Sequence, residues 1–504
     1  MENKKQIKWG ILLQYGQMFI GAAISLFYTP LTLNILGQTE YGLYNLSSSI
    51  ISYLSLLSLG FGSSYIRFYS KYKTKGNDDD IAKLNWLYLL TFTIMGIVSL
   101  ILGILVSNNV RLFFNQTYTL EDMKIAKKLM ILLTINLSLS FPMSLFNAYI
   151  ISQEKFIFQK IVSIITTIIG PCLSICALLL GYGSIGMVAI TTLLTTVLNL
   201  INIVYCFKKL KFRIKIGRTQ TGLFKEIFVF SFFIAMNQII DQINWQTDKI
   251  ILGKMINASA VAIYAIASTI NNYYVCFSTA ITDVFVPEIN RIENEGGVDK
   301  DKKLTDIFIK VGRLQWIVLS LVLTGFVFFG KIFIIKWAGS DYVTSYYIIL
   351  LLIVPVTIPL LQSVGIDIQR AKNMHKFRSI VYLVMAVLNV IISIILCKFY
   401  GIIGVTLGTT ISLVVANGLI MNIYYYKKIK LNVLKFWKEI LKMMPGLIVP
   451  VLLGTCILIV YRFNNIVEYV CLIILYVIIF AISMYCLALN KNERDIIKKK
   501  LGKK

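Results

Sequence analysis

Long apolar runs alternate with short polar stretches along the whole chain. Each run reaches at least about 18 residues, which is enough for an α-helix to cross a hydrocarbon core of ~30 Å. No polar stretch is long enough to form a separate soluble domain. The pattern predicts an all-α, polytopic membrane protein with about fourteen transmembrane helices, at residues 8–35, 42–68, 82–106, 125–151, 156–181, 184–207, 224–249, 259–287, 307–332, 343–369, 377–398, 402–426, 436–460 and 466–489.

Lysine and arginine residues are concentrated in alternate connections between these runs. The intervening connections, such as "LGQTEYG" and "GYGS", are nearly uncharged. The positive-inside rule then places both termini in the cytoplasm. This bias also accounts for the net charge of +26, and no basic face with stacking platforms is visible. We therefore expect the positively charged connections to contact a lipid bilayer and not to bind nucleic acid.

Two parts of the chain resemble each other. "QEKFIFQKIVSI" at 153–164 is similar to "MHKFRSIVYLVM" at 374–385, and "GYGSIGMVAITTLLTTVLNLINIVYCFKK" at 181–209 is similar to "FYGIIGVTLGTTISLVVANGLIMNIYYYKK" at 399–428. Because the paired segments are separated by a nearly constant number of residues, the repeat predicts two homologous six-helix lobes around a central cavity, at 1–215 and 216–430. Two further helices and a basic cytoplasmic tail follow at 431–504. Parallel repeats of this kind are typical of transporters that work by alternating access, and a duplicated membrane scaffold is the alternative.

A polar stripe runs along the predicted helix at 224–249. Asn237, Asp241, Asn244 and Asp248 fall within about 60° of one another at 100° per residue. Ionisable groups at membrane depth cost about 2.5–3.5 kcal/mol each on insertion scales, so they usually face water or a partner. We expect this helix to line the cavity between the lobes, with Asp241 exposed to it. A structural hydrogen bond is the alternative for Asp241, and an interfacial position beside Lys249 is the alternative for Asp248.

The first predicted helix carries a similar stripe that includes Gln14, Gln17 and Tyr28. These residues are expected to line the same cavity, although helix packing through small and hydroxyl residues would produce the same pattern. Arg67, at the end of the second predicted helix, is a candidate for gripping a lipid pyrophosphate, because a guanidinium binds such groups in bidentate fashion. Snorkelling to the membrane surface is the alternative for Arg67.

Motifs for catalysis and for resident cofactors are missing from the sequence. There is no G-x-x-x-x-G-K-[ST] phosphate loop, no H-E-x-x-H and no C-x-x-C pair, and His375 is the single histidine. The chain is therefore expected to be no enzyme and to hold neither a cofactor nor a structural metal.

The segment "LNILGQTEYGLYNLSSSIISYLSLLSLGFGSSYIRF" at 33–68 carries a recognisable pattern. It has Leu-Gly, then Glu-Tyr-Gly-Leu-Tyr, a serine-rich helix, Leu-Gly-Phe-Gly and an arginine. This pattern resembles the polysaccharide repeat-unit flippases (O-antigen, capsule and teichuronic-type) of the multidrug/oligosaccharidyl-lipid/polysaccharide (MOP) exporter superfamily. "TDKIILGKMINASAVAIYAIASTI" at 247–270 resembles the start of that family's second lobe. The resemblance covers essentially the whole chain.

The resemblance implies a flippase in the bacterial cytoplasmic membrane that moves undecaprenyl-pyrophosphate-linked oligosaccharides to the outer leaflet. A polysaccharide polymerase and glycosyltransferases would be its partners. The deep charges here are sparse and Asp241 is acidic, which favours a neutral or amino-sugar glycan. Asp241 could also bind a coupling H⁺ or Na⁺. A cation-coupled multidrug exporter, a peptidoglycan precursor flippase and a non-transporting scaffold remain as alternatives.

Overall fold

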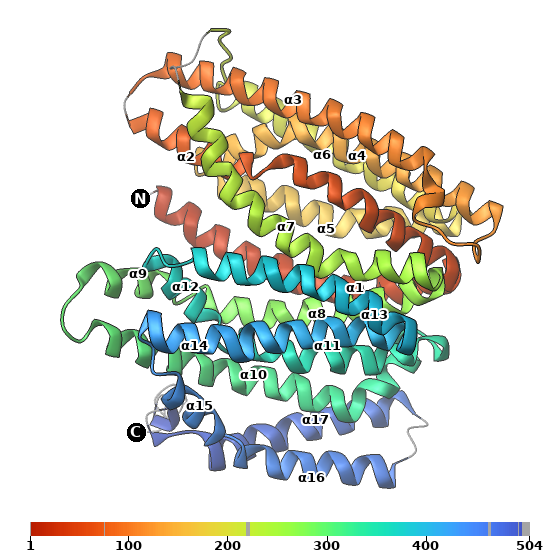
Figure 1. The fold of residues 1–504 in the computed structure, drawn as a ribbon, viewed down its shortest axis with the longest axis vertical. Helices are drawn as coiled ribbons and strands as arrows, with labels where there is room; N and C mark the ends of the chain where they lie inside the picture. Colours follow the sequence, from red (N-terminus) through yellow and green to blue (C-terminus); the bar gives the residue numbers. More distant parts are fainter. Residues whose placement is uncertain (1, 75, 218–221, 462–464, 492, 496–504) are drawn as a thin grey trace. The chain divides into compact units, whose positions relative to one another are not determined.

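Helices account for nearly all of the regular structure in the described part of the chain (Figure 1). The structure is a computed structural model that describes residues 2–74, 76–217, 222–461, 465–491 and 493–495. Eleven helical stretches in these residues are long and apolar enough to cross a membrane, or twelve if one bent pair is a single span. The prediction of an all-α polytopic membrane protein is therefore confirmed.

The chain divides into two compact units, of which the first comprises Met1–Ala265 and Val390–Val405. In it α3 packs along α4, α1 along α5, and α6 against both α4 and α5. A cluster of buried aromatic side chains that includes Tyr65, Tyr88 and Phe92 joins α2, α3 and α4. Its helices are α1 (Glu2–Ser52), η1 (Tyr53–Ser58), α2 (Phe61–Thr74), α3 (Asp78–Asn108), η2 (Val110–Leu112), α4 (Leu120–Ser152), α5 (Phe156–Leu179), α6 (Gly183–Lys208) and α7 (Leu223–Met255).

The second unit comprises Ile266–Asn389 and Thr406–Lys504, and α8 (Ala258–Thr282) and α13 (Lys376–Leu413) contribute to both units. In it α10 packs against α11 and α15, and α16 pairs with α17 (Figure 1). Besides α8 and α13, its helices are α9 (Val286–Glu295), α10 (Lys300–Trp337), η3 (Ser340–Tyr342), α11 (Thr344–Leu361), α12 (Ser363–Ala371), η4 (Val414–Met421), α14 (Asn422–Tyr424), η5 (Tyr425–Ile429), α15 (Val433–Leu441), α16 (Pro445–Val460), α17 (Ile466–Ser483) and η6 (Met484–Ala488).

Two of the membrane stretches have double length. Leu13–Thr74 spans 62 residues and Lys376–Ile429 spans 54 residues, whereas a single crossing needs about 20. The helical path changes direction inside each at a glycine with positive φ, Gly37 (φ 70°) and Gly401 (φ 57°). Glycine tolerates this backbone conformation because it has no Cβ. Each long stretch can therefore cross twice, and with the bent pair counted as one span the twelve spans of the described residues then correspond to the fourteen predicted helices.

Three predicted helices are broken in the structure. The one at 42–68 is interrupted by η1 and by Leu59 in the left-handed region, and the one at 343–369 breaks at Gln362 between α11 and α12. The one at 436–460 becomes α15 and α16, which are bent by 43°. Pro445 begins α16, a position that proline tolerates because the first N–H groups of a helix have no acceptor within the helix.

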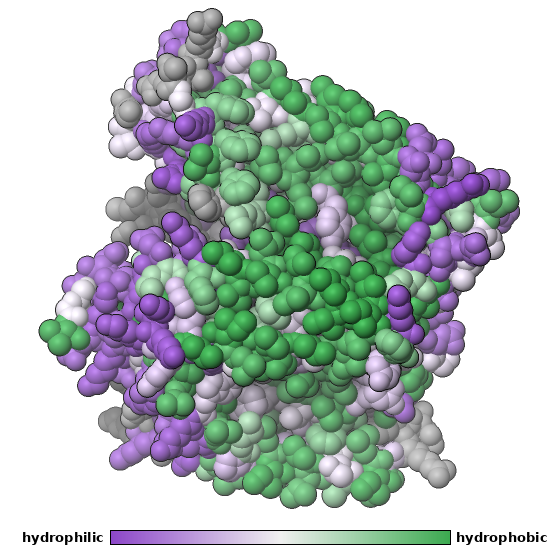
Figure 2. All heavy atoms as spheres, in the orientation of Figure 1, coloured by the Kyte–Doolittle hydropathy of each residue, from purple (hydrophilic) through white to green (hydrophobic). Residues whose placement is uncertain are grey.

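Hydrophobic side chains cover the middle of the long helices, and hydrophilic side chains gather toward the helix ends (Figure 2). Many large apolar side chains are exposed, among them Phe27 (73%) and Ile459 (79%). Such extensive exposure is unfavourable in water but suits a surface that contacts lipid. The helices thus present their apolar faces to a bilayer.

Candidate functional site

The polar stripe of α7 is divided into two halves that have different surroundings. Asn237 and Asp241, nearer the Leu223 end, are exposed. From Gln242 to the Met255 end the same face is at least partly buried, and Asn244 belongs to this half-buried part. The structure therefore separates residues that looked equivalent in the sequence.

The Met255 half of the stripe is hydrogen-bonded to α1 and η1, within the first unit. Ser49 Oγ donates to Gln246 Oε1 at 2.9 Å, and Gln242 donates from its amide to Ser52 Oγ. Tyr53 Oη lies 2.5 Å from Thr247 Oγ1 and 3.3 Å from the Gln242 carbonyl oxygen. We call this set of contacts the α1–α7 zipper; it holds the end of α1 against one half of α7.

Asp248 lies beside the zipper but faces α8. Its side chain is only 1% exposed, and Tyr264 Oη donates to Asp248 Oδ2 at 2.5 Å. Because a buried carboxylate needs a donor, this phenol stabilises Asp248 inside the helix packing. In this conformation Asp248 is therefore not at an open surface, although the next residue, Lys249, is half-buried.

The candidate residues of the first helix also point in different directions. Gln14 is exposed. Gln17 donates from Nε2 to Thr167 Oγ1 of α5 at 3.3 Å, and Tyr28 Oη lies 3.1 Å from Met187 Sδ of α6. Gln17 and Tyr28 thus contact neighbouring helices of their own unit, as the packing alternative proposed.

Arg67 is exposed and lies over the ring of Phe230 on α7, with 4.3 Å between the guanidinium carbon and the ring centroid. Both residues line a cavity of about 790 Å³ that also receives Lys71 and Lys225. Lys71 pairs with Glu226 at 3.3 Å, but both side chains are more than half exposed, so this contact is weak. The cavity therefore has a net positive lining.

Several residues of these sites were not identified from the sequence. Lys71 and Lys225 resemble the other lysines of the basic connections, so nothing in the sequence distinguishes them. Tyr53 and Tyr264 resemble ordinary interfacial or packing tyrosines until their partners are known. The signal for Tyr53 was the serine-rich stretch just before it, because small hydroxyl residues in a membrane helix often mark a contact with another helix.

Comparison with known proteins bears on this arrangement. The family model described as "Polysaccharide biosynthesis protein" matches residues 8–293. The chain belongs to this family. The match includes α1, α2 and α7, and hence both the zipper and the cavity beside Arg67.

One curated relative and two solved structures are similar to this chain at low sequence identity. The "Uncharacterized membrane protein EpsK" of Bacillus subtilis (strain 168) is 23% identical over 410 residues, which are 80% of this chain and 79% of EpsK. A solved structure of the lipid II flippase MurJ in an inward closed conformation has a TM-score of 0.72 at 16% identity, covering 98% of this chain and 99% of MurJ. An inward-facing multidrug resistance (MATE) transporter has a TM-score of 0.66 at 13% identity, covering 84% of this chain and 99% of its own.

These similarities confirm the predicted resemblance and show that the chain has the MOP fold. By family it is a protein of polysaccharide biosynthesis, and its fold is shared with the MurJ and MATE structures. The lobe boundaries at 215 and 430, the orientation of the termini and the roles of the individual site residues stay predictions.

Proposed function

We propose that this protein is a flippase that translocates undecaprenyl-pyrophosphate-linked oligosaccharide repeat units across the bacterial cytoplasmic membrane by alternating access. The observation that carries the proposal is the division of the α7 stripe. One half, with Asn237 and Asp241, is exposed, and the other half is closed by the α1–α7 zipper. A polar path that is open on one side and hydrogen-bonded shut on the other suits a transporter in one of its two states.

The direction of this path follows from the predicted topology. With both termini in the cytoplasm, the Leu223 end of α7 lies at the cytoplasmic side and the Met255 end at the outer side. The exposed half is then open to the cytoplasm, where a repeat unit is assembled. The zipper then seals the outer side, and its opening would release the glycan.

Arg67 and its cavity suit the charged part of such a substrate. A pyrophosphate presents oxygens that a guanidinium binds in bidentate fashion, and Lys71 and Lys225 add positive charge to the same cavity. Exposed Phe228 and Val229 lie next to Phe230 on α7, so an apolar surface for the lipid adjoins the basic lining. The pyrophosphate would bind at the cytoplasmic end while the lipid tail remains in the bilayer.

Asp241 is proposed to meet the glycan and to bind the coupling ion. Its acidic charge favours a neutral or amino-sugar repeat unit over a strongly acidic one. H⁺ or Na⁺ bound there would gain about 2.3 kcal/mol per charge and 100 mV of membrane potential. Proteoliposome transport by Asp241→Asn that kept its full dependence on an ion gradient would remove the coupling role.

The decisive experiment is mass spectrometry of polyprenyl-linked glycans from cells that lack the protein. We expect a completed pyrophosphate-linked oligosaccharide to accumulate while the surface polymer is lost, and both changes to be reversed by the wild-type gene. Accumulation of a peptidoglycan precursor would instead identify that lipid as the substrate. An unchanged lipid pool contradicts the proposal. If the cells also become sensitive to cationic drugs, the result would favour the multidrug exporter. If their drug sensitivity stays the same, it would favour the non-transporting scaffold.

A further inference from the structure

The short helix α15 is held on the second unit in one fixed rotation about its own axis. Phe436, on its buried side, stacks on Phe308 of α10 with 4.3 Å between the ring centroids. Trp437 donates from Nε1 to Asn422 Oδ1 of α14 at 2.9 Å. Because both contacts lie on the same side of α15, the opposite side is presented outward.

The outward side of α15 combines exposed leucines with exposed lysines. Leu434 and Leu441 are 72% and 60% exposed, and seven residues separate them, so they lie one above the other along the helix. Lys435, Lys438 and Lys442 are also exposed, and at 100° per residue they lie about 40–120° round the helix from the leucines. An apolar edge beside a basic edge is typical of a helix that lies in the plane of a membrane interface.

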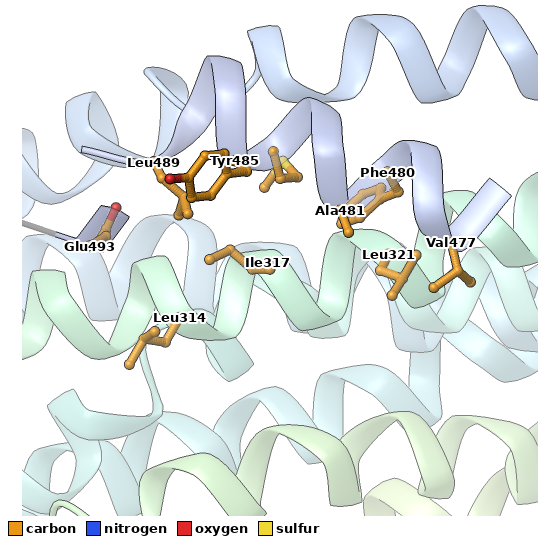
Figure 3. Close-up of a pocket in the computed structure, with 10 residues that line it drawn as sticks. Leu314, Ile317, Leu321, Val477, Phe480, Ala481, Tyr485, Leu489 and Glu493 are labelled. Carbon is orange, nitrogen blue, oxygen red and sulfur yellow. The ribbon is translucent and has the colours of Figure 1, made fainter. Parts of the chain in front are cut away.

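The acidic residue of α15, Glu439, is held from the inside by Arg313 of α10. Nη1 of Arg313 donates to the Glu439 carbonyl oxygen at 3.1 Å and to its carboxylate at 3.5 Å. Arg313 also donates to both carboxylate oxygens of Glu493, at 2.7 Å each, and Glu493 lies at one end of an apolar groove between α10 and α17 (Figure 3). Since the carboxylate of α15 is engaged by Arg313, the charge that α15 exposes is mainly positive.

The three lysines of α15 differ in how strongly they are paired. Lys435 Nζ lies 3.3 Å from Asp306 Oδ1, and Lys442 Nζ donates to Glu439 Oε1 at 2.5 Å. Both lysine side chains are more than half exposed, so these contacts are weak. Lys438 makes no ion pair within the residues that the structure describes, and it is exposed. Lys438 is therefore the lysine most available to an external anion.

The position of α15 along the chain places it at the membrane surface. Residues 442–444 join it to α16, and the two helices, bent by 43°, together form one candidate membrane span. The exposed apolar side chains of α16 begin at once, with Ile448 (56%) and Leu452 (60%). The leucine edge of α15 thus continues into a surface that contacts lipid. By the predicted topology this end of α16 is cytoplasmic.

We propose that α15 lies in the cytoplasmic interface of the bilayer and binds anionic lipid head groups. Leu434 and Leu441 enter the acyl layer, and Lys438, supported by Lys435 and Lys442, contacts the head groups. Each lysine near an anionic membrane surface favours binding by about fivefold. Because α15 is packed on α10 and leads into α16, the bound lipids anchor this end of the second unit. This role is independent of the substrate that the protein transports.

Fluorescence quenching in vesicles tests the proposal on the full-length protein. A fluorophore is attached to Leu434→Cys in a background without the native cysteines, and the protein is reconstituted into mixed phosphatidylcholine and phosphatidylglycerol. Bromine atoms on the acyl chains of one lipid or the other act as the quencher. We expect quenching by both brominated lipids and a stronger effect from phosphatidylglycerol. Lys438→Gln should lower the ratio of the two effects by about fivefold.

The matched control is Lys336→Gln, which removes an exposed lysine from the last turn of α10. This position is roughly 40 Å along α10 from Phe308, which contacts α15, so the ratio should not change. Lys438→Arg keeps the charge and should keep the ratio. Leu441→Cys repeats the measurement at a second position in case the first label disturbs the helix.

Three results would overturn the proposal. Quenching by iodide in the aqueous phase, without quenching by the brominated lipids, would mean that the leucine edge lies in water. Protection from both quenchers would mean that another protein segment covers α15. An equal change of the ratio in Lys438→Gln and Lys336→Gln would mean that the overall charge of the protein, and not α15, selects the lipid.

Discussion

The α1–α7 zipper should determine how often the outer side of the polar path opens. We consider Tyr53→Phe combined with Gln246→Met, which removes the contacts of Tyr53 with Thr247 and with the Gln242 carbonyl and the contact of Ser49 with Gln246. Hydrogen bonds between membrane helices contribute about 0.6 kcal/mol on average and at most about 1.7 kcal/mol. Three such bonds sum to about 2 kcal/mol, which corresponds to a roughly 30-fold shift toward the open state.

The assay is the labelling rate of Asp241→Cys by a membrane-impermeant thiol reagent added from the outside, in a background without the native cysteines. We expect the rate to rise by about 30-fold in the double variant, because labelling requires the open state. Tyr182→Phe is the matched control, since its side chain is 67% exposed and lies outside the zipper. A rate that stays at the wild-type value in folded protein would refute the view that these bonds keep the path closed.

Three further predictions concern other parts of the chain. Arg67→Lys should retain part of the transport that Arg67→Gln loses, because lysine keeps the charge but not the bidentate geometry. The amount of lipid-linked glycan that accumulates in cells carrying each variant measures the loss of transport. Gly401→Ala should destabilise the protein by about 1–2 kcal/mol, because alanine is strained at φ 57°. Gly418→Ala, in a helix with room for a Cβ, is the control and should not destabilise it. Thermal unfolding of the two variants measures the difference. Burial by itself raises the pKa of Glu493, but its hydrogen bond with Arg313 and further favourable contacts lower it overall, so Glu493→Gln should destabilise at neutral pH. A carboxylate with a lowered pKa contributes stability that is lost as it is protonated. The difference in stability between the wild type and Glu493→Gln should therefore shrink as the pH falls below about 4.

The sequence predicted the membrane class and the positions of most helices because apolar run length is a direct requirement of the bilayer. It did not predict where helices break. Hydropathy does not register the left-handed backbone of Leu59, nor the bend before Pro445, since neither interrupts the apolar pattern. Gly37 and Gly401 lie in the predicted gaps, and there the structure has continuous helical stretches with a sharp change of direction.

The candidate site was predicted as a set of polar residues without their partners. Periodicity placed Asp241 and Asp248 on one face of α7, which requires only the helical repeat. It could not distinguish the exposed Asp241 from Asp248, because the difference arises from Tyr264 on another helix. Likewise, the sequence pattern around Gln17 is the same whether its side chain faces a cavity or contacts another helix, and in the structure it donates to Thr167.

The weakness of the zipper is itself an argument for its role. At about 0.6 kcal/mol each, the four hydrogen bonds of the zipper contribute about 2.4 kcal/mol, which is enough to favour the closed state and small enough to be broken in each cycle of the proposed transport. One charge that crosses 100 mV supplies about 2.3 kcal/mol, which is the same magnitude. A seal made of buried ion pairs would be far harder to open, because removing one partner of such a pair costs about 3–5 kcal/mol. Under the proposed ion-coupled mechanism, a contact made of serine, glutamine, threonine and tyrosine would be a seal that one or a few ions can open, and the buried acidic residue beside the zipper, Asp248, accepts a hydrogen bond from Tyr264 of α8.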